Sequence, residues 1–203
     1  MEFLNLGKNL LSGKIPNCWM KWHNLGVLNL VNNNFAGSLP ESIGSLTLLK
    51  FLHLYNNKFS GKLSFLKNCE ELGRILEYST ILQLVKSVDF SHNNLSREIP
   101  EEVTNLRGLQ SLNLLYNLLI GSIPKNIGKM ESLESMDFFV NQLSSQIPSI
   151  LSSLAFLNHL NFSNNNLIRK IPSDTQLQSF NAFSFMGNKL CGLPLSDTCT
   201  VVL

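Results

Sequence analysis

Asparagine and proline recur along this chain with a common spacing, and this restricts the possible folds more than any other feature. Equivalent Asn residues are separated by 24 positions, apart from one step of 36, and six of the seven Pro residues follow one of them by seven positions. Two series in one register indicate a repeat protein, in which each unit buries its apolar side only by stacking on its neighbours. The repeated residues are Asn9, Asn33, Asn57, Asn93, Asn117, Asn141 and Asn165.

Each unit follows the pattern L-x-L-x-x-N-x-L-x-G-x-I-P, and each conserved slot has a physical reason. Leu28 and Leu30 alternate with other residues at a period of two, which predicts a short strand with one buried face. The amide of Asn33 can satisfy backbone groups that the turning chain leaves unpaired, so stacked Asn residues predict a buried ladder. Gly37 permits a positive φ, and Pro40 prevents the chain from continuing as a strand or helix.

Composition excludes several classes of protein. The net charge of +2 is too small and too scattered for a nucleic-acid-binding stripe, and 44% hydrophobic residues exclude intrinsic disorder. Most of the 39 Leu residues fall in core slots of the repeat, and one Asn in each repeat, of 25 in the chain, falls in the Asn series. We expect neither a signal peptide nor a transmembrane helix within these 203 residues.

Catalysis and cofactors are not expected. His53, His92 and His159 occupy repeat positions where solvated polar residues belong. No nucleophile elbow, metal-ligand spacing or glycine-rich phosphate loop accompanies them, so the sequence predicts no enzyme, no metal site and no cofactor.

The 24-residue spacing, the Asn and the G-x-I-P segment resemble the plant-specific leucine-rich repeat. The resemblance implies an α/β solenoid with a parallel sheet on its concave face. We divide the chain into repeats 1–3 without an N-terminal cap (1–69), an irregular insertion (70–80), repeats 4–7 (81–172) and a C-terminal cap (173–203). Without such a cap, the first repeat is expected to expose Leu4, Leu6 and Leu11, and the chain is therefore expected to be poorly soluble alone.

The insertion has two interpretations. One is a loop or short helix tolerated at the solenoid surface. The other follows from resemblance: Gly73 to Tyr78 and Leu84 to Ser87 are similar to the exit of the non-repeat island of plant receptor-like proteins, which makes the segment a remnant of that island.

The C-terminal segment predicts a cover for the last repeat. Cys191 and Cys199 are close enough in sequence to form a disulfide, which implies an oxidising compartment. Cys18 and Cys69 lie two repeats apart, about 10 Å by strand spacing, too far for a bond, so both are predicted to be buried free thiols.

The cap segments T-Q-x-x-x-F and L-C-G-x-P-L resemble those of plant leucine-rich-repeat receptor-like proteins of the Cf and ethylene-inducing-xylanase-receptor type. The resemblance implies a plasma-membrane receptor without a kinase, with an anchor missing from this chain, that binds an apoplastic protein or peptide ligand and signals through co-receptor and adaptor kinases. It places co-receptor docking at Thr175, Gln176 and Phe180, although these residues could serve only to cover the core.

The concave face is where a ligand site is expected. The second outward column contains Tyr55, Leu115 and Phe139, and Tyr116 and Val140 lie beside the last two. An exposed apolar patch of this kind often marks a partner site, although drift from the usual Ser is the alternative.

Two sequons, at Asn94 and Asn161, predict glycosylation if the chain is secreted. Two other functions remain open. One is a secreted inhibitor of microbial wall-degrading enzymes, which resembles the same repeat but lacks this cap. The other is a truncated gene product without independent activity.

Overall fold

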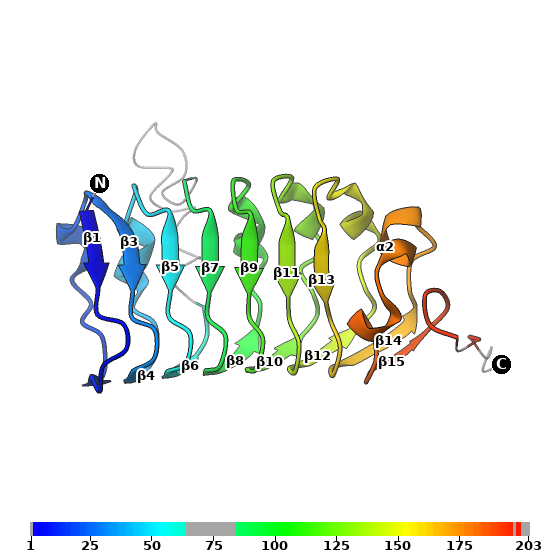
Figure 1. Cartoon of the computed structure of the whole chain (residues 1–203), viewed down its shortest axis with the longest axis horizontal. Helices are drawn as coiled ribbons and strands as arrows, with labels where there is room; N and C mark the ends of the chain where they lie inside the picture. Colours follow the sequence, from blue (N-terminus) through cyan, green and yellow to red (C-terminus); the bar gives the residue numbers. More distant parts are fainter. Residues whose placement is uncertain (1, 64–83, 197, 200–203) are drawn as a thin grey trace.

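The repeats form an elongated solenoid with a parallel sheet along one side (Figure 1). The computed structural model describes residues 2–63, 84–196 and 198–199. Within them, seven strands pair in chain order, so each repeat contributes one strand, as the period of two around Leu28 predicts. The strands of this seven-stranded sheet are β1 (Glu2–Asn5), β3 (Leu25–Asn29), β5 (Phe51–His53), β7 (Ser87–Asp89), β9 (Ser111–Asn113), β11 (Ser135–Asp137) and β13 (His159–Asn161).

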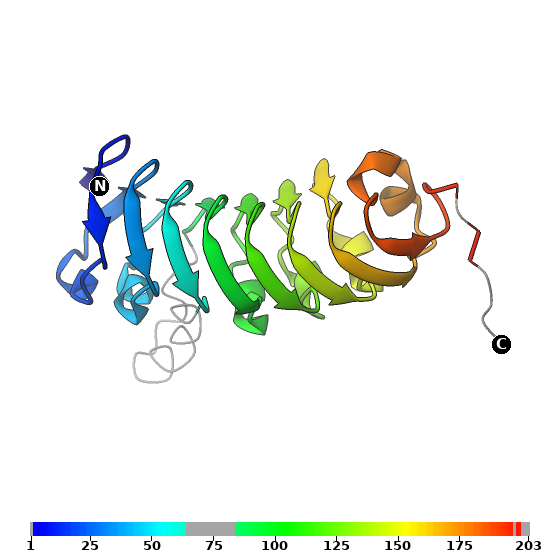
Figure 2. The same ribbon diagram turned by 90° about the horizontal axis from the view of Figure 1, so that it is seen from below.

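A second parallel sheet, which the sequence did not predict, follows the same axis (Figure 2). It forms where the segment after each repeated Asn stacks on its neighbour. Its eight strands in the described residues are β2 (Ser12–Gly13), β4 (Asn34–Gly37), β6 (Lys58–Gly61), β8 (Asn94–Glu98), β10 (Leu118–Gly121), β12 (Gln142–Ser145), β14 (Asn166–Lys170) and β15 (Lys189–Cys191).

Short helices return the chain from the second sheet to the first. Pro40, Pro100 and Pro148 stand immediately before three of them with extended backbones, as the fixed φ of proline requires. The helices are η1 (Trp19–Lys21), η2 (Glu41–Ser45), η4 (Glu101–Asn105), η5 (Ile127–Lys129), η6 (Ser149–Ser153), α2 (Thr175–Ser179) and η7 (Ala182–Ser184).

The predicted asparagine ladder is present and holds neighbouring repeats together. Asn117 is typical: its Oδ1 accepts the N–H of Leu95 at 3.0 Å, and its Nδ2 donates to the carbonyls of Phe90 and Leu114, both at 3.0 Å. Six of the predicted rungs are buried, from Asn33 onwards.

The ends of the ladder differ from the prediction. Asn9 is exposed, and its Nδ2 donates only to carbonyls of its own repeat, at Leu6 and Gly7. At the other end Asn188, which the spacing missed, accepts the N–H of Leu167 and donates to Phe162. The ladder therefore continues into the cap.

The glycine slot keeps its backbone conformation even where Gly is absent. Arg97, Ser145 and Arg169 occupy this slot with φ of 81°, 72° and 75°, close to the 82° of Gly37. The stacking of the second sheet therefore imposes a left-handed backbone on Arg97, Ser145 and Arg169, and this conformation is strained for residues other than Gly.

Other predictions about individual residues have mixed outcomes. Cys18 is a free thiol, but it is exposed rather than buried because it lies beside the open side of the first repeat. Leu6 and Leu11 are exposed and Leu4 is half-buried. Cys69 and the insertion at 70–80 lie outside the described residues.

The cap covers the last repeat. Phe185 and Leu177 are fully buried, and the Cys191–Cys199 disulfide is formed, as predicted. The backbone N–H of Phe162 donates to the carbonyl of Ser184 at 2.8 Å, so the cap extends the hydrogen bonding of the seven-stranded sheet.

Candidate functional site

The strands of the seven-stranded sheet end in a turn that is repeated along the solenoid. At the end of six strands, a side-chain oxygen accepts the N–H of the residue two positions later, at 2.9–3.2 Å. Such Asx turns bind the polar side chain to its own backbone. The six polar side chains at the strand ends are therefore partly engaged in structure: Asn5, Asn29, Asp89, Asn113, Asp137 and Asn161.

After each turn, the residue before the ladder Asn adopts a left-handed backbone. His92, Tyr116 and Val140 have φ of 51°, 51° and 52° there. Asn tolerates this conformation and occupies the equivalent slot at Asn32 and Asn164, whereas a β-branched Val is strained in it. The stacking of the repeats holds Val140 in this left-handed conformation, although an Asn in the same slot would be less strained.

Three side chains in these turns form a continuous row of rings across repeats 4 to 6. The rings of His92 and Tyr116 stack with centroids 4.5 Å apart, and the ring of Phe139 meets Tyr116 edge-on at 5.1 Å. We call His92, Tyr116 and Phe139 the aromatic row. The sequence prediction omitted His92 from the ligand patch, although its position in the repeat is the same as that of Tyr116 and could have indicated it.

The structure brings together four of the five residues predicted for the ligand patch. These four residues are Leu115, Tyr116, Phe139 and Val140. They lie on two adjacent repeats, which are joined here by a hydrogen bond of 2.8 Å from the N–H of Tyr116 to the carbonyl of Phe139. Tyr116 is 43% exposed, whereas the other three are half-buried. Tyr55 lies two strands from Leu115 and is not part of this group.

Ionisable groups lie beside the aromatic row. The Nε2 of His159 is 3.6 Å from Oδ2 of Asp137. Burial lowers the pKa of His53 below its ordinary value of 6.5, and the nearby Asp89 carboxylate partly opposes this. The Nε2 of His53 also lies 3.1 Å from the hydroxyl of Ser87.

The residues predicted for co-receptor docking face different ways. Helix α2 begins after Asp174, whose carboxylate accepts the N–H of Gln176 at 2.9 Å. The Gln176 side chain points into the last repeat, where Nε2 donates to the carbonyl of Leu154 at 2.6 Å. Thr175 is exposed and Phe180 is half-buried, so these two residues can reach a partner and Gln176 secures the cap.

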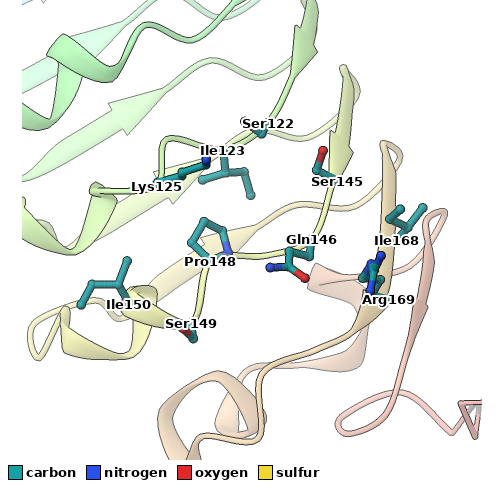
Figure 3. Close-up of a pocket in the computed structure, with 10 residues that line it drawn as sticks. All are labelled: Ser122, Ile123, Lys125, Ser145, Gln146, Pro148, Ser149, Ile150, Ile168 and Arg169. Carbon is teal, nitrogen blue, oxygen red and sulfur yellow. The ribbon is translucent and has the colours of Figure 1, made fainter.

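Two hollows flank the last repeats. One of about 480 Å³ lies between β13 and the cap. The other, of about 660 Å³, lies on the side of the second sheet, where Figure 3 shows Lys125 and Arg169 well apart around Pro148 and Gln146. Most residues that line the second hollow are exposed, so it is an open groove without a converging set of reactive groups.

The described residues contain no group of three or more His, Cys, Asp or Glu placed to hold a metal ion. Over the same residues, no helix is both long and apolar enough to cross a bilayer. The predicted glycosylation sites differ in setting: Asn94 is exposed at the start of β8, and Asn161 is half-buried at the end of β13.

Comparison with known proteins agrees with this architecture. A family model described as Leucine Rich Repeat matches residues 24–46, 84–106, 108–130 and 156–178. The search of curated proteins found no match.

Among solved structures, the Arabidopsis receptor kinase HAESA, in complex with the peptide hormone IDA and the co-receptor SERK1, is 35% identical, with a TM-score of 0.82. The ectodomain of the Arabidopsis thaliana receptor kinase GASSHO1/SCHENGEN3, in complex with CASPARIAN STRIP INTEGRITY FACTOR 2, is 36% identical, with a TM-score of 0.86. Each alignment covers 98% of this chain, which spans only 31% and 22% of those two proteins.

A shorter relative is covered over most of its length. In the BIR3–SERK2 complex from Arabidopsis thaliana, the matched chain is 31% identical, with a TM-score of 0.56, and the match covers 81% of this chain and 69% of that one. The repeat geometry, the ladder and these similarities agree, and the chain belongs to the leucine-rich-repeat family of plant receptor ectodomains.

Proposed function

We propose that this chain is a ligand-binding part of the extracellular domain of a plant receptor-like protein, and that it binds an extended peptide across the aromatic row. The observation that carries the proposal is the exposed Tyr116 ring, held between His92 and Phe139 over three consecutive repeats. Rigid aromatic side chains supply much of the binding energy of protein interfaces. The HAESA and GASSHO1 structures, which contain a peptide hormone and a peptide factor, support this ligand class.

The geometry beside the row suits a peptide in an extended conformation. Successive strands present Leu115 and Phe139 at one strand spacing, about 4.8 Å, so side chains on one face of an extended peptide can contact successive repeats. The Asx turn of Asp89 uses Oδ1, and no hydrogen bond to its Oδ2 is found among the described residues. That oxygen is available to a donor group of the ligand.

The proposed mechanism is association without chemistry. A peptide on the aromatic row and a co-receptor at the cap would be held on one rigid solenoid, so ligand binding favours assembly of the signalling pair. The resemblance of the cap to the Cf type supports a receptor-like protein without a kinase, at the outer side of the plasma membrane. The SERK1 co-receptor in the HAESA complex supports the class of partner.

Selection of peptides from a random decapeptide display library tests the ligand site. Peptides enriched on the wild-type chain are expected to lose about 30-fold in affinity on Tyr116→Ala, the loss expected of an interface hot spot. Tyr55→Ala, two strands away, is the matched control and is expected to retain affinity. Selected peptides that bind Tyr116→Ala and Phe139→Ala as tightly as wild type would remove the aromatic row as the site.

A separate measurement tests docking at the cap. SERK1 ectodomain binding is expected to weaken on Thr175→Ala combined with Phe180→Ala, because these side chains reach solvent. Gln176→Ala serves as a comparison, because Gln176 acts within the cap and its removal should lower the melting temperature. Unchanged SERK1 affinity of the double variant would refute docking at these residues.

A further inference from the structure

The hollow at the end of the seven-stranded sheet is formed by the last strand and the cap together. It is an open hollow of about 480 Å³. The cap is fixed against the strand by the 2.8 Å hydrogen bond from Phe162 to Ser184. The residues that matter for its chemistry are His159, Asn161 and Ser163 on the strand side and Phe180, Asn181 and Phe183 on the cap side.

The walls of this hollow combine aromatic and polar groups. Phe183 is 71% exposed and Phe180 is half-buried, so both rings offer apolar surface to an occupant. Asn181 and Asn161 add amides, and Ser184 adds a hydroxyl. A sugar ring has apolar C–H faces and polar hydroxyls at its rim, so this combination of groups complements a monosaccharide.

Asn161 is itself the acceptor residue of a sequon. Its Oδ1 accepts hydrogen bonds from the N–H of Ser163 at 3.2 Å and from the Ser163 hydroxyl at 2.7 Å. No hydrogen bond from its Nδ2 is found in the described part of the chain. The atom that would bear a glycan is therefore free, while the oxygen keeps the turn intact.

We propose that Asn161 carries an N-linked glycan and that its first N-acetylglucosamine lies in the hollow, against Phe183. The inference rests on the proposed extracellular placement. In the attachment step, Nδ2 forms a bond to C1 of the sugar as the C1–O bond to a lipid-linked pyrophosphate oligosaccharide breaks. The amide loses one proton to solvent, and the lipid pyrophosphate leaves.

Attachment precedes folding of this repeat, because the folded chain leaves Ser163 only 7% exposed. Asn94 provides the contrast: it is exposed at the first position of β8, so a glycan there extends into water.

The test uses the full chain secreted from plant cells behind a heterologous signal peptide. Asn161→Asp removes the glycan and keeps the turn, because Asp89 and Asp137 already accept the same hydrogen bond in their repeats. Asn94→Asp is the matched control. Mass spectrometry measures occupancy, and melting temperature is measured with intact glycans, with glycans trimmed to one N-acetylglucosamine, and for each variant.

We expect Asn161 to be occupied and the melting temperature to stay unchanged when the glycans are trimmed to one sugar. In Asn161→Asp the melting temperature should fall by about 2–4 °C, the scale of a modest contact in a chain of this size. Asn94→Asp should melt like the wild type. In a Phe183→Ala background, the effect of Asn161→Asp should shrink by at least half, which isolates the contact between sugar and ring.

Two outcomes would overturn the inference. One is an unoccupied Asn161 in the secreted chain. The other is an occupied Asn161 whose effect on melting is unchanged by Phe183→Ala. Peptide binding to the aromatic row, measured on the same Asn161→Asp protein, reports separately on the proposed function.

Discussion

Replacing Asn117 by Ala tests the asparagine ladder as the link between repeats. The substitution leaves the N–H of Leu95 buried without its acceptor, which costs about 1–3 kcal/mol. It also removes two hydrogen bonds of 3.0 Å to the carbonyls of Phe90 and Leu114, each worth about 0.5–1.5 kcal/mol. The expected loss in the free energy of unfolding is therefore about 2–6 kcal/mol.

Asn9→Ala is the matched control, because it removes the same side chain from the same slot of the motif. Asn9 is exposed and bonds only to carbonyls of its own repeat, which water can hydrate after the substitution. We expect a loss below about 1 kcal/mol. Equilibrium urea unfolding followed by circular dichroism measures both, and amide hydrogen exchange at Leu95 should accelerate only in Asn117→Ala.

The comparison can refute the reasoning directly. Equal losses for Asn9→Ala and Asn117→Ala would show that burial of the amide contributes nothing beyond its local bonds. A loss below about 1 kcal/mol for Asn117→Ala would show that the buried N–H of Leu95 finds another partner at little cost.

Three further predictions concern strain, the cap and pH. Val140→Asn should raise the free energy of unfolding by about 1 kcal/mol, because Asn tolerates the left-handed backbone, and Asn164→Val should lower it by a similar amount; thermal melting of both decides whether φ is the cause. Replacing Cys191 and Cys199 by Ser should cost about 2–3 kcal/mol in urea unfolding, the value for a short closed loop, and a loss near zero would mean that the cap holds without it. Because burial lowers the pKa of His53, the folded state binds its proton less readily than the unfolded chain. The contribution of His53 is then complete above about pH 6.5 and declines as the pH falls below it. Between pH 5 and 8, the free energy of unfolding should depend less steeply on pH in His53→Gln than in the wild type. An unchanged slope would mean that other groups cause the pH dependence.

Much of the fold could be predicted because the repeat is a local pattern. Leu28 and Leu30 indicate a buried strand face, and Asn33 indicates the turn that follows it. The second sheet escaped prediction because segments such as 34–37 contain Asn and Gly, which are poor strand formers. They pair as strands because stacking of the repeats aligns them and a ladder Asn of the next repeat accepts one N–H of each segment, as Asn57 does from Phe35, which is a tertiary effect.

The candidate site could be predicted only in part. Residues 24 positions apart become neighbours once the repeats stack, so the group of Leu115 and Phe139 follows from the spacing alone. The same spacing places His92 beside Tyr116, but it does not report that the two rings stack. The cap lies outside the period, so the inward direction of Gln176 could not be read from it.

The sequence by itself determined the repeat, the ladder, the order of the strands and the disulfide, because each depends on spacing along the chain. The tertiary structure decided which side chains are exposed, how the rings of the aromatic row meet, and that Asn161 opens into a hollow beside Phe183. Those properties depend on side-chain contacts between neighbouring repeats and between the last repeat and a cap of different sequence. No periodic pattern encodes such contacts, because they exist only after both parts have folded against each other.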